Sequence, residues 1–296
     1  MRVATQSIYR GIQQSIWRLS RELKKMEDKV SSGKNFNRPS DNPVAVVHSL
    51  GLRSKLARIE QYQKNMDTGQ VWLDMNETVL NQVSKVAARA QDIALRLSSG
   101  NQTAEVRAMA VSEIDQLLDE AIALGNTQSN GKYIFGGYRT DVPPFARSLS
   151  GGVENVVYQG DGNDFQVQIG PDETMTAGKN GETVFMDSDL FAGLRDLKQA
   201  IADNDQTAIE NQSAVLQEAT DYFNAQVSDV GIRQTRLKIK EEIFSQFNLQ
   251  LQNQVDDLEN VDYSRAILEL KEKQTAYEVA LAAAAKISEV SLLNYL

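Results

Sequence analysis

The side chains that most often carry chemistry are scarce in this sequence. Its 296 residues include no cysteine and a single histidine, His48. Without cysteine there is no disulfide, no thiolate nucleophile and no cysteine-bound metal, and one imidazole without clustered partners is usually a surface or packing residue. We therefore assign His48 no role, and we predict no catalytic residue, no cofactor-binding residue and no metal site.

Asp161, Asn163 and Asp164 resemble the start of a calcium-binding loop. Such a loop spreads its oxygen ligands over twelve residues and closes with a glutamate, and this pattern is missing here. Asp and Asn beside Gly also favour tight turns. The flanking segments VENVVYQ and DFQVQIG are β-branched and partly alternating, so we predict that they pair as a short hairpin around this turn.

The composition is that of an ordinary folded protein, with 24% charged and 41% apolar residues. No apolar run of about 18 residues is present, and the first 30 residues lack the apolar core and cleavage site of a secretory signal. We therefore expect neither membrane insertion nor a cleaved signal peptide. The net charge of −9 argues against a nucleic-acid partner.

The two ends of the chain carry opposite charge. Residues 1–34 hold eight basic and three acidic side chains, whereas residues 255–296 hold eight acidic and four basic ones. Residues 141–190 hold nine acidic and two basic side chains and account for most of the surplus negative charge. Opposite signs at the two ends favour side-by-side pairing of the end segments, although exposed ion pairs set orientation more than stability.

The N-terminal segment has the seven-residue repeat of a coiled coil. Its apolar residues alternate at spacings of four and three: Tyr9, Ile12, Ile16, Leu19, Leu23, Met26 and Val30. The repeat ends at Gly33, which is a common signal for the end of a helix. We predict that these seven side chains form one side of an assembly seam.

Glycine and proline mark one joint and one insert in a sequence that is otherwise helical in pattern. Pro39 and Pro43 lie in a polar stretch where a second helix can begin, and we interpret them as a joint as well as a helix start. From Gly231 onward neither Gly nor Pro occurs, and a single helix of that length would span about 100 Å. We therefore expect an elongated molecule, with a bend in this helix where Asp262 can cap a new start.

The C-terminal segment is apolar around most of its helical circumference. The side chains that we assign to the seam there are Val279, Leu281, Ala284, Ile287, Val290, Leu292 and Leu293. A helix of this kind needs burial on several sides, and the N-terminal helix can cover only one. An ordinary core helix is the alternative. We favour further copies of the chain as the missing neighbours, in a head-to-tail contact that does not close.

Four stretches resemble the bacterial flagellin-like axial proteins. They are Ser32-Gly33-Lys34 with the segment 37–43 that ends in Pro-Ser-Asp-Asn-Pro, the segment 131–145 that ends in Thr-Asp-Val-Pro-Pro-Phe, the segment 158–161, and the C-terminal segment 262–296. Asn42 stands where the family more often has Asp. The motifs occur in order and at compatible spacing over essentially the whole chain.

This resemblance implies a mainly α fold: an elongated antiparallel helical rod, a terminal coiled coil made of both chain ends, and one small β-rich inserted outer domain. The implied domains are a terminal domain of residues 1–42 and 262–296, a rod of 43–140 and 190–261, and an outer domain of 141–189. Pro39, Pro43 and Asp262 would form the joint between the terminal domain and the rod.

The resemblance also implies a function, which is that of a structural adaptor in the bacterial flagellum rather than an enzyme. Its implied partners are copies of itself, hook-associated protein 1 on the hook side, flagellin on the filament side, and an export chaperone before secretion. Export would use the flagellar type III apparatus without a cleaved signal. Two alternatives remain: flagellin itself, and outside this class a secreted coiled-coil scaffold or effector.

Overall fold

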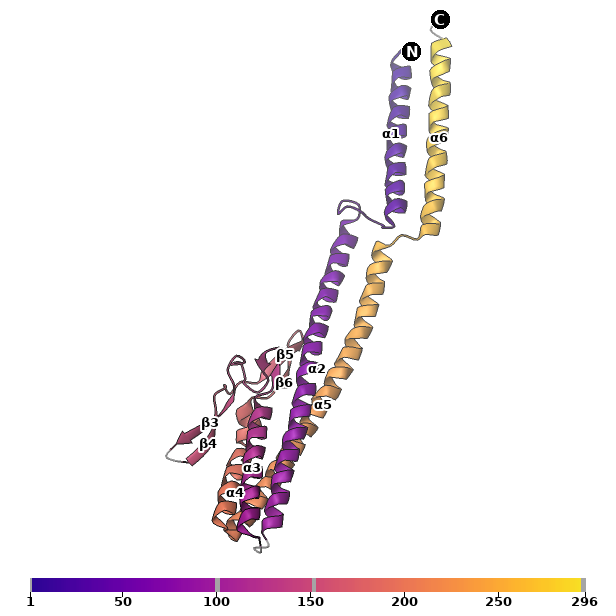
Figure 1. The fold of residues 1–296 in the computed structure, drawn as a ribbon. Coiled ribbons are helices and arrows are strands. Elements are labelled where there is room, and N and C mark those ends of the chain that lie inside the picture. Colours follow the sequence, from indigo (N-terminus) through magenta and orange to yellow (C-terminus); the bar gives the residue numbers. More distant parts are fainter. Residues whose placement is uncertain (1, 99–101, 151–152, 294–296) are drawn as a thin grey trace. The chain divides into compact units, whose positions relative to one another are not determined.

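Long helices make up most of this computed structural model, which describes residues 2–98, 102–150 and 153–293, with backbone alone for 2–6, 8, 150 and 287–293. The mainly α prediction is confirmed (Figure 1). The helices are α1 (Arg2–Ser32), α2 (Pro43–Leu97), α3 (Ala104–Gly125), α4 (Leu190–Asp203), α5 (Gln206–Glu259) and α6 (Tyr263–Leu293), with one π-helical turn, η1 (Glu182–Met186). No helix in the described ranges is both long and apolar enough to cross a membrane.

Polar side chains fix where several helices begin. The Asn42 side chain accepts a hydrogen bond from the Ala45 amide at 3.1 Å, directly before Pro43 opens α2. Thr103 accepts from the Val106 amide at the start of α3, and Asp262 accepts from the Ser264 amide at 3.0 Å at the start of α6. Each cap satisfies one of the amides that has no partner inside the helix, so the boundaries follow from local sequence.

Six short strands form three separate two-stranded antiparallel sheets. They are β1 (Gln128–Ser129), β2 (Lys132–Tyr133), β3 (Phe145–Ser150), β4 (Val153–Tyr158), β5 (Phe165–Gly170) and β6 (Glu173–Gly178). The segments VENVVYQ and DFQVQIG contain β4 and β5. The prediction that these two segments pair as a hairpin is wrong, because β4 pairs with β3 and β5 pairs with β6. Between them, the Asp161 carboxylate accepts hydrogen bonds from the amides of Tyr138 and Asn163, which holds this loop away from a hairpin turn.

The chain divides into two compact units, the first made of residues 1–58 and 246–296 and the second of residues 59–245. Helices α2 and α5 contribute to both units and continue unbroken through these boundaries. The division into terminal, rod and outer domains stays a prediction.

The second unit is built around a cluster of buried aromatic rings. Phe185 lies at its centre, with ring centroids 5.0 Å from Phe145, 5.8 Å from Phe191 and 5.9 Å from Phe223. Helices α3 and α4 pack side by side next to this cluster. Gly125, at the end of α3, leaves the room that Phe145 occupies, since a Cβ there would lie 2.6 Å from the Phe145 ring.

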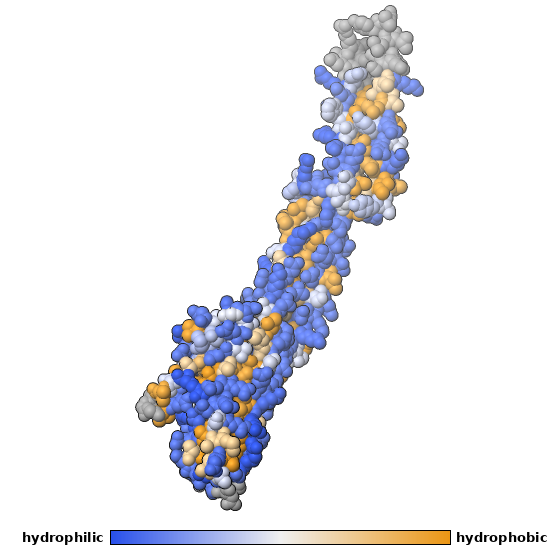
Figure 2. Space-filling model, viewed as in Figure 1, coloured by the Kyte–Doolittle hydropathy of each residue, from blue (hydrophilic) through white to orange (hydrophobic). Residues whose placement is uncertain are grey.

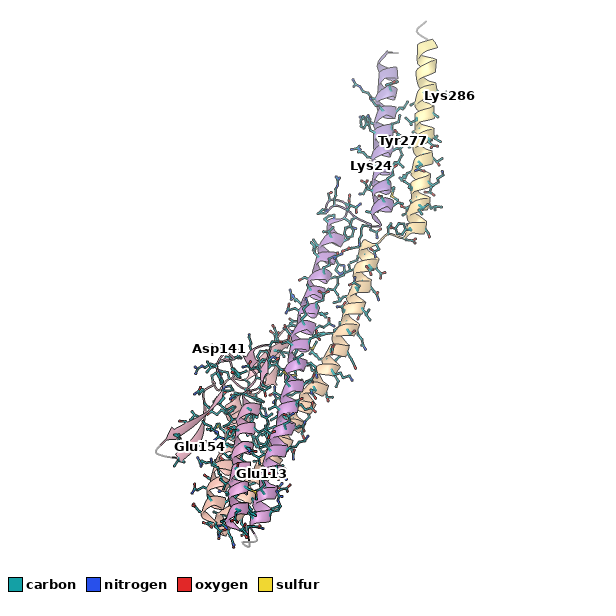
Figure 3. All side chains as sticks on the ribbon, viewed as in Figure 1. Lys24, Glu113, Asp141, Glu154, Tyr277 and Lys286 are labelled. Atoms are coloured by element: carbon teal, nitrogen blue, oxygen red, sulfur yellow. The ribbon has the colours of Figure 1, made fainter. Side chains whose placement is uncertain are left out.

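An ion-pair network ties the β3–β4 hairpin to the two short helices. Lys198 on α4 binds Asp115 of α3 at 2.9 Å and Glu154 of β4 at 2.6 Å, and Arg147 of β3 binds the same two carboxylates. Figure 3 labels Glu154 among the side chains of the chain. Hydrogen bonds from Lys198 are the main reason that the pKa values of Asp115 and Glu154 lie below their usual range. Four elements are thereby held together at one point.

We expect Phe185→Ala to destabilise the second unit by about 3 to 5 kcal/mol, because it removes a fully buried ring and leaves a cavity. The measurement is urea unfolding followed by circular dichroism. Leu149→Ala is the matched control, because Leu149 on β3 is 79% exposed and its loss should change stability by less than about 0.5 kcal/mol. Equal effects of the two variants would contradict the placement of the core.

Candidate assembly surface and helix joint

Helices α1 and α6 pack along each other within the first unit (Figure 1). The least exposed side chains of α6 include six at alternating spacings of four and three, which is the pattern of a helix face packed on another helix. These are Ala266, Leu270, Lys273, Tyr277, Ala280 and Ala284, and Glu269 and Gln274 are also half-buried.

The structure brings together only part of the predicted seam. On α1 six of its seven residues are half-buried, namely Ile12, Ile16, Leu19, Leu23, Met26 and Val30, whereas Tyr9 is exposed. On α6 Ala284 is half-buried, but Val279 is 62% exposed and Leu281 is also exposed. The remaining four, Ile287, Val290, Leu292 and Leu293, fall outside the side chains that the structure describes.

The predicted seam on α6 begins at Val279, so it does not include Ala266, Leu270 and Tyr277, although their spacing is present in the sequence. Ala280 lies in the continuous apolar run 279–285, in which the sequence alone does not show the packed face. Three of the six positions of this face are alanines, and Leu270 and Tyr277 are its large side chains. Leu268 and Val279 are exposed.

The opposite charges of the two ends contribute little to this packing. Among the described residues a single ion pair joins α1 to α6, between Lys273 Nζ and Glu22 Oε2 at 2.6 Å. It uses one of the few acids of the basic helix and one of the few bases of the acidic helix. The hydrogen bond from Lys273 lowers the pKa of Glu22, yet both side chains are 41% exposed, and such pairs stabilise weakly.

Several apolar side chains of α6 are exposed. Leu268 and Val279 lie on one side of the helix and border a shallow groove, whereas Ile267 and Leu281 lie on other sides of it. Figure 2 shows apolar residues in orange along the surface of this pair of helices. Trp17 adds an exposed ring on α1. Apolar surface left exposed on a folded protein is a candidate interaction site.

The joint between the helices is held by backbone pairing of two short segments. The Asn35 amide donates to the Glu259 carbonyl at 2.7 Å, and the Val261 amide donates to the Gly33 carbonyl at 2.9 Å. The Asn35 side chain also donates to the Asn260 carbonyl at 2.8 Å. Gly33 has a φ of 70°, which favours glycine, and any Cβ there would meet the hydroxyl of Tyr263. The α1–α2 and α5–α6 connections are thus joined directly.

Glu259 is the charged centre of this joint. Its buried carboxylate accepts hydrogen bonds from Arg53 Nε and Nη2, both at 2.7 Å, from Lys34 Nζ at 3.1 Å and from the Ser49 hydroxyl. The bond from Arg53 is the largest contribution, and together these donors lower the pKa of Glu259 from 4.5 to about 2. One carboxylate at the end of α5 therefore holds the start of α2 and the segment after α1.

The three residues assigned to the joint lie at or beside this network. Pro43 is the first residue of α2, Asp262 caps α6, and Pro39 lies in the loop where the Asp41 carboxylate accepts the Arg38 amide at 3.1 Å. Sequence reasoning missed Lys34, Ser49, Arg53 and Glu259, because residues more than 200 positions apart in the chain give no local signal. Their function as a joint between domains stays a prediction.

Chemistry of other kinds has little support in the described part of the chain. His48 is exposed near the start of α2 and is not close to other potential ligands. No group of three or more His, Asp or Glu residues among those described could hold a metal ion. The surface of the α1–α6 pair offers a hydrophobic, partly charged contact area instead.

Comparison with known proteins gives a consistent family. The bacterial flagellin N-terminal helical region matches residues 3–140, and the bacterial flagellin C-terminal helical region matches residues 213–296. The flagellar hook-associated protein 3 of Escherichia coli K12 is 26% identical to this chain over 99% of both chains. The protein of that name from Salmonella typhimurium is 28% identical over 62% of this chain and 57% of its own.

Solved structures agree in fold. A putative flagellar hook-associated protein from Vibrio parahaemolyticus superimposes with a TM-score of 0.67 and 22% identity, covering 74% of this chain and all of its own. FlgL from Bacillus cereus superimposes with a TM-score of 0.59 and 27% identity, covering 70% of this chain and 99% of its own.

We expect Glu259→Gln to destabilise the joint by about 1 to 3 kcal/mol at neutral pH, because the charge-assisted hydrogen bonds from Arg53 and Lys34 are weakened. Hydrogen exchange at the Asn35 and Val261 amides reports the loss locally. The exposed Glu27→Gln is the control and should leave both amides unchanged.

The same network predicts a pH dependence. Because the folded pKa of Glu259 is below its unfolded value, the stabilisation is complete above about pH 4.5 and is lost as the pH falls toward 2. The difference between wild type and Glu259→Gln should therefore be constant from pH 7 to about 4.5 and shrink below it. A difference that already declines at pH 6 would show that another group controls the joint.

Proposed function

The chain belongs to the bacterial flagellin family, whose members are structural proteins of the flagellum, and we propose that it is the adaptor subunit between hook and filament. In this proposal it joins hook-associated protein 1 on the hook side to the flagellin filament. The observation that carries it is similarity to hook-associated protein 3 over 99% of both chains, which extends through the inserted β region as well as the helical ends.

Exposed apolar side chains on α6 support a role in assembly. Leu268, Val279 and Leu281 remain exposed in the isolated chain although α6 is already paired with α1. Burying such side chains stabilises an assembly by about 1.5 to 3 kcal/mol each. We assign the α1–α6 pair to contacts with further copies of this chain, with hook-associated protein 1 and with flagellin.

The joint and the β region complete this proposal. The division into terminal domain, rod and outer domain places the Glu259 network between the terminal domain and the rod, where it would fix the direction of the helices that enter the assembly. The outer domain would be displayed away from that contact.

Export forms the last part of the proposal. The protein would reach the flagellum through the type III apparatus without a cleaved signal, held before secretion by a cytoplasmic chaperone that covers the apolar side of α6. The exposed side chains on α6 support the need for such cover, because an uncovered apolar surface promotes aggregation.

Flagellin itself is the second candidate, since both family regions are shared with filament proteins. Binding and polymerisation separate the two. The purified chain should bind immobilised hook-associated protein 1 and stay short, and deletion of its gene should leave hooks without filaments. Long filaments grown from the purified chain alone, without binding to hook-associated protein 1, would favour flagellin instead.

We expect Leu23→Asp and Leu281→Asp each to abolish filament attachment while the second unit stays folded. Leu23 is half-buried between α1 and α6, and Leu281 lies on the exposed side of α6 that the assembly would cover. A charge in a water-excluded contact is costly. The measurements are electron microscopy of flagella in a deletion strain and circular dichroism of the purified variants.

Leu149→Asp is the control, because this exposed residue lies on the β3–β4 hairpin, outside the proposed contact. It should support normal attachment. Normal attachment by Leu23→Asp or Leu281→Asp would instead refute the assignment of the α1–α6 pair.

A further inference from the structure

A second exposed surface lies on α5, in the second unit and apart from the α1–α6 pair. Its positions recur every three or four residues and are all exposed, so they share one side of the helix. We name this the free face of α5; it consists of Glu218, Asp221, Ala225, Ser228, Ile232, Thr235 and Ile239. Along the chain it is first acidic, then small, then apolar.

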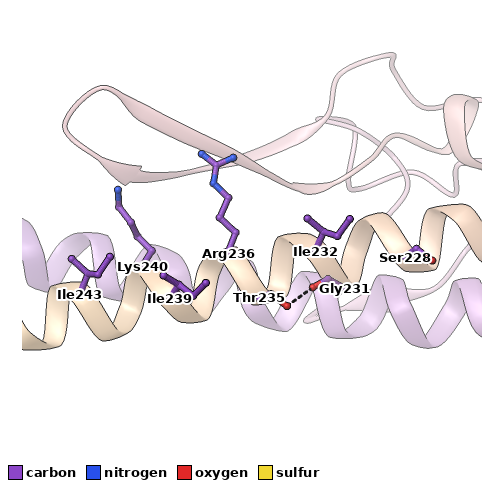
Figure 4. Close-up of a pocket in the computed structure, with 8 residues that line it drawn as sticks. All are labelled: Ser228, Gly231, Ile232, Thr235, Arg236, Ile239, Lys240 and Ile243. Carbon is purple, nitrogen blue, oxygen red and sulfur yellow. Dashed lines mark hydrogen bonds between the residues drawn. The ribbon is translucent and has the colours of Figure 1, made fainter.

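The apolar part of this face is prominent. Ile232 is 69% exposed and Ile239 is 54% exposed, and both line a shallow groove with Ser228 and Thr235. Figure 4 shows that Arg236 and Lys240, at the edge of the groove, reach toward the β5–β6 hairpin, where they bind Glu173 at 2.8 and 2.5 Å. The two basic side chains at the edge share one carboxylate, and the isoleucines stay uncovered.

Helix α2 carries a second free face near its start, in the first unit. Val44, Val47, Gly51, Lys55 and Arg58 are exposed there at helical spacing, about 120° around the helix from the side on which α2 packs against α5. This face is first apolar, then small, then basic. Within the described residues neither Lys55 nor Arg58 has an ion-pair partner.

Gly51 has no explanation inside the chain. It lies in the middle of a long helix, where glycine costs roughly 0.5 to 1 kcal/mol relative to alanine, and a Cβ there would meet no atom within 4 Å. A missing side chain on an exposed helix face permits another helix to approach closely. Ser228 is the small residue at the corresponding place on the free face of α5.

The two faces match when the helices run in opposite directions. Setting Gly51 opposite Ser228 also sets Val47 opposite Ile232 and Arg58 opposite Asp221, since both intervals are the same on each helix. Apolar then meets apolar, small meets small, and base meets acid. Asp221 has one partner among the described residues, the neutral side chain of Gln217, so its charge is available to a cation.

The contact would join two different surfaces of the chain, the face of α2 in one copy and the face of α5 in another. A contact between two different surfaces does not close on itself, so it can be repeated from copy to copy.

The size of the surface also fits a repeated contact better than an isolated dimer. The few exposed aliphatic side chains offer on the order of 300 Å², whereas a stable interface buries about 800 Å² on each partner. By itself the contact would be weak. In an assembly that is also held elsewhere it would fix which residues of neighbouring copies meet.

We propose that the free face of α2 in one copy docks on the free face of α5 in a second copy, with the two helices antiparallel. The proposal rests on the proposed function, because it needs an ordered assembly of copies. It assigns Arg58 and Asp221 to an ion pair between copies and Gly51 to the point of closest approach.

The chain has no cysteine, so the contact can be tested by engineered disulfides. A chain carrying both Gly51→Cys and Ser228→Cys replaces the wild type in the bacterium, and isolated flagella are oxidised and analysed without reductant. Because a disulfide forms only when the two Cα atoms lie within about 7 Å, the pair should give about tenfold more disulfide-linked dimer than a control pair.

The control pair is Ala57→Cys with Ser228→Cys. Ala57 is exposed but lies about 120° around α2 from Gly51, and should point away from the neighbour. Incorporation of the double variant without dimer above the control level would overturn the proposal, and so would a disulfide to a protein of another mass. Absence of the wild-type chain from the flagella would instead refute the proposed function.

Charge reversal gives an independent test if the cysteine variants are not incorporated. Arg58→Glu and Asp221→Arg should each lower the number of attached filaments about threefold, since each places like charges opposite each other between copies. The double variant should restore the wild-type number. Failure of the double variant to recover, with both single variants folded, would overturn the proposed register.

Discussion

A pair of helices can cover only one side of each member, and this limit decides much of the structure. Helix α6 is apolar around most of its circumference, yet α1 covers one side of it, mainly through alanines, Leu270 and Tyr277. Other large side chains of α6, such as Leu268 and Val279, stay exposed. A monomer therefore leaves apolar surface of α6 uncovered, which is the physical basis for its assignment to an assembly.

Contact with neighbours is useful only if the helices that make it are held firmly. The Glu259 carboxylate performs this function in the first unit by binding Arg53, Ser49 and Lys34, while backbone hydrogen bonds join the two connections. A buried carboxylate needs these donors to remain charged, and the donors come from two segments, α2 and the residues after α1. The same group that costs energy to bury thereby fixes how the segments meet.

The second unit meets a different requirement, which is to hold short β hairpins on long helices. Each sheet has two strands and would be marginal alone, so the hairpins depend on the helices. The Phe185 cluster, the Lys198 and Arg147 network, and Glu173 with Arg236 and Lys240 supply that support. Two of the nine acidic residues in 141–190, Glu154 and Glu173, are paired in this way.

The sequence by itself determined the elements. The heptad spacing in residues 9–30 and the caps at Asn42 and Asp262 depend on neighbours within a few positions, so they can be read locally. The scarcity of cysteine and histidine follows from composition alone. The tertiary structure decided the partners: which side of α6 meets α1, which strands pair, and which bases bind Glu259. These choices join residues up to about 250 positions apart, and they are made by packing volume and by satisfaction of buried charge, which no local pattern records.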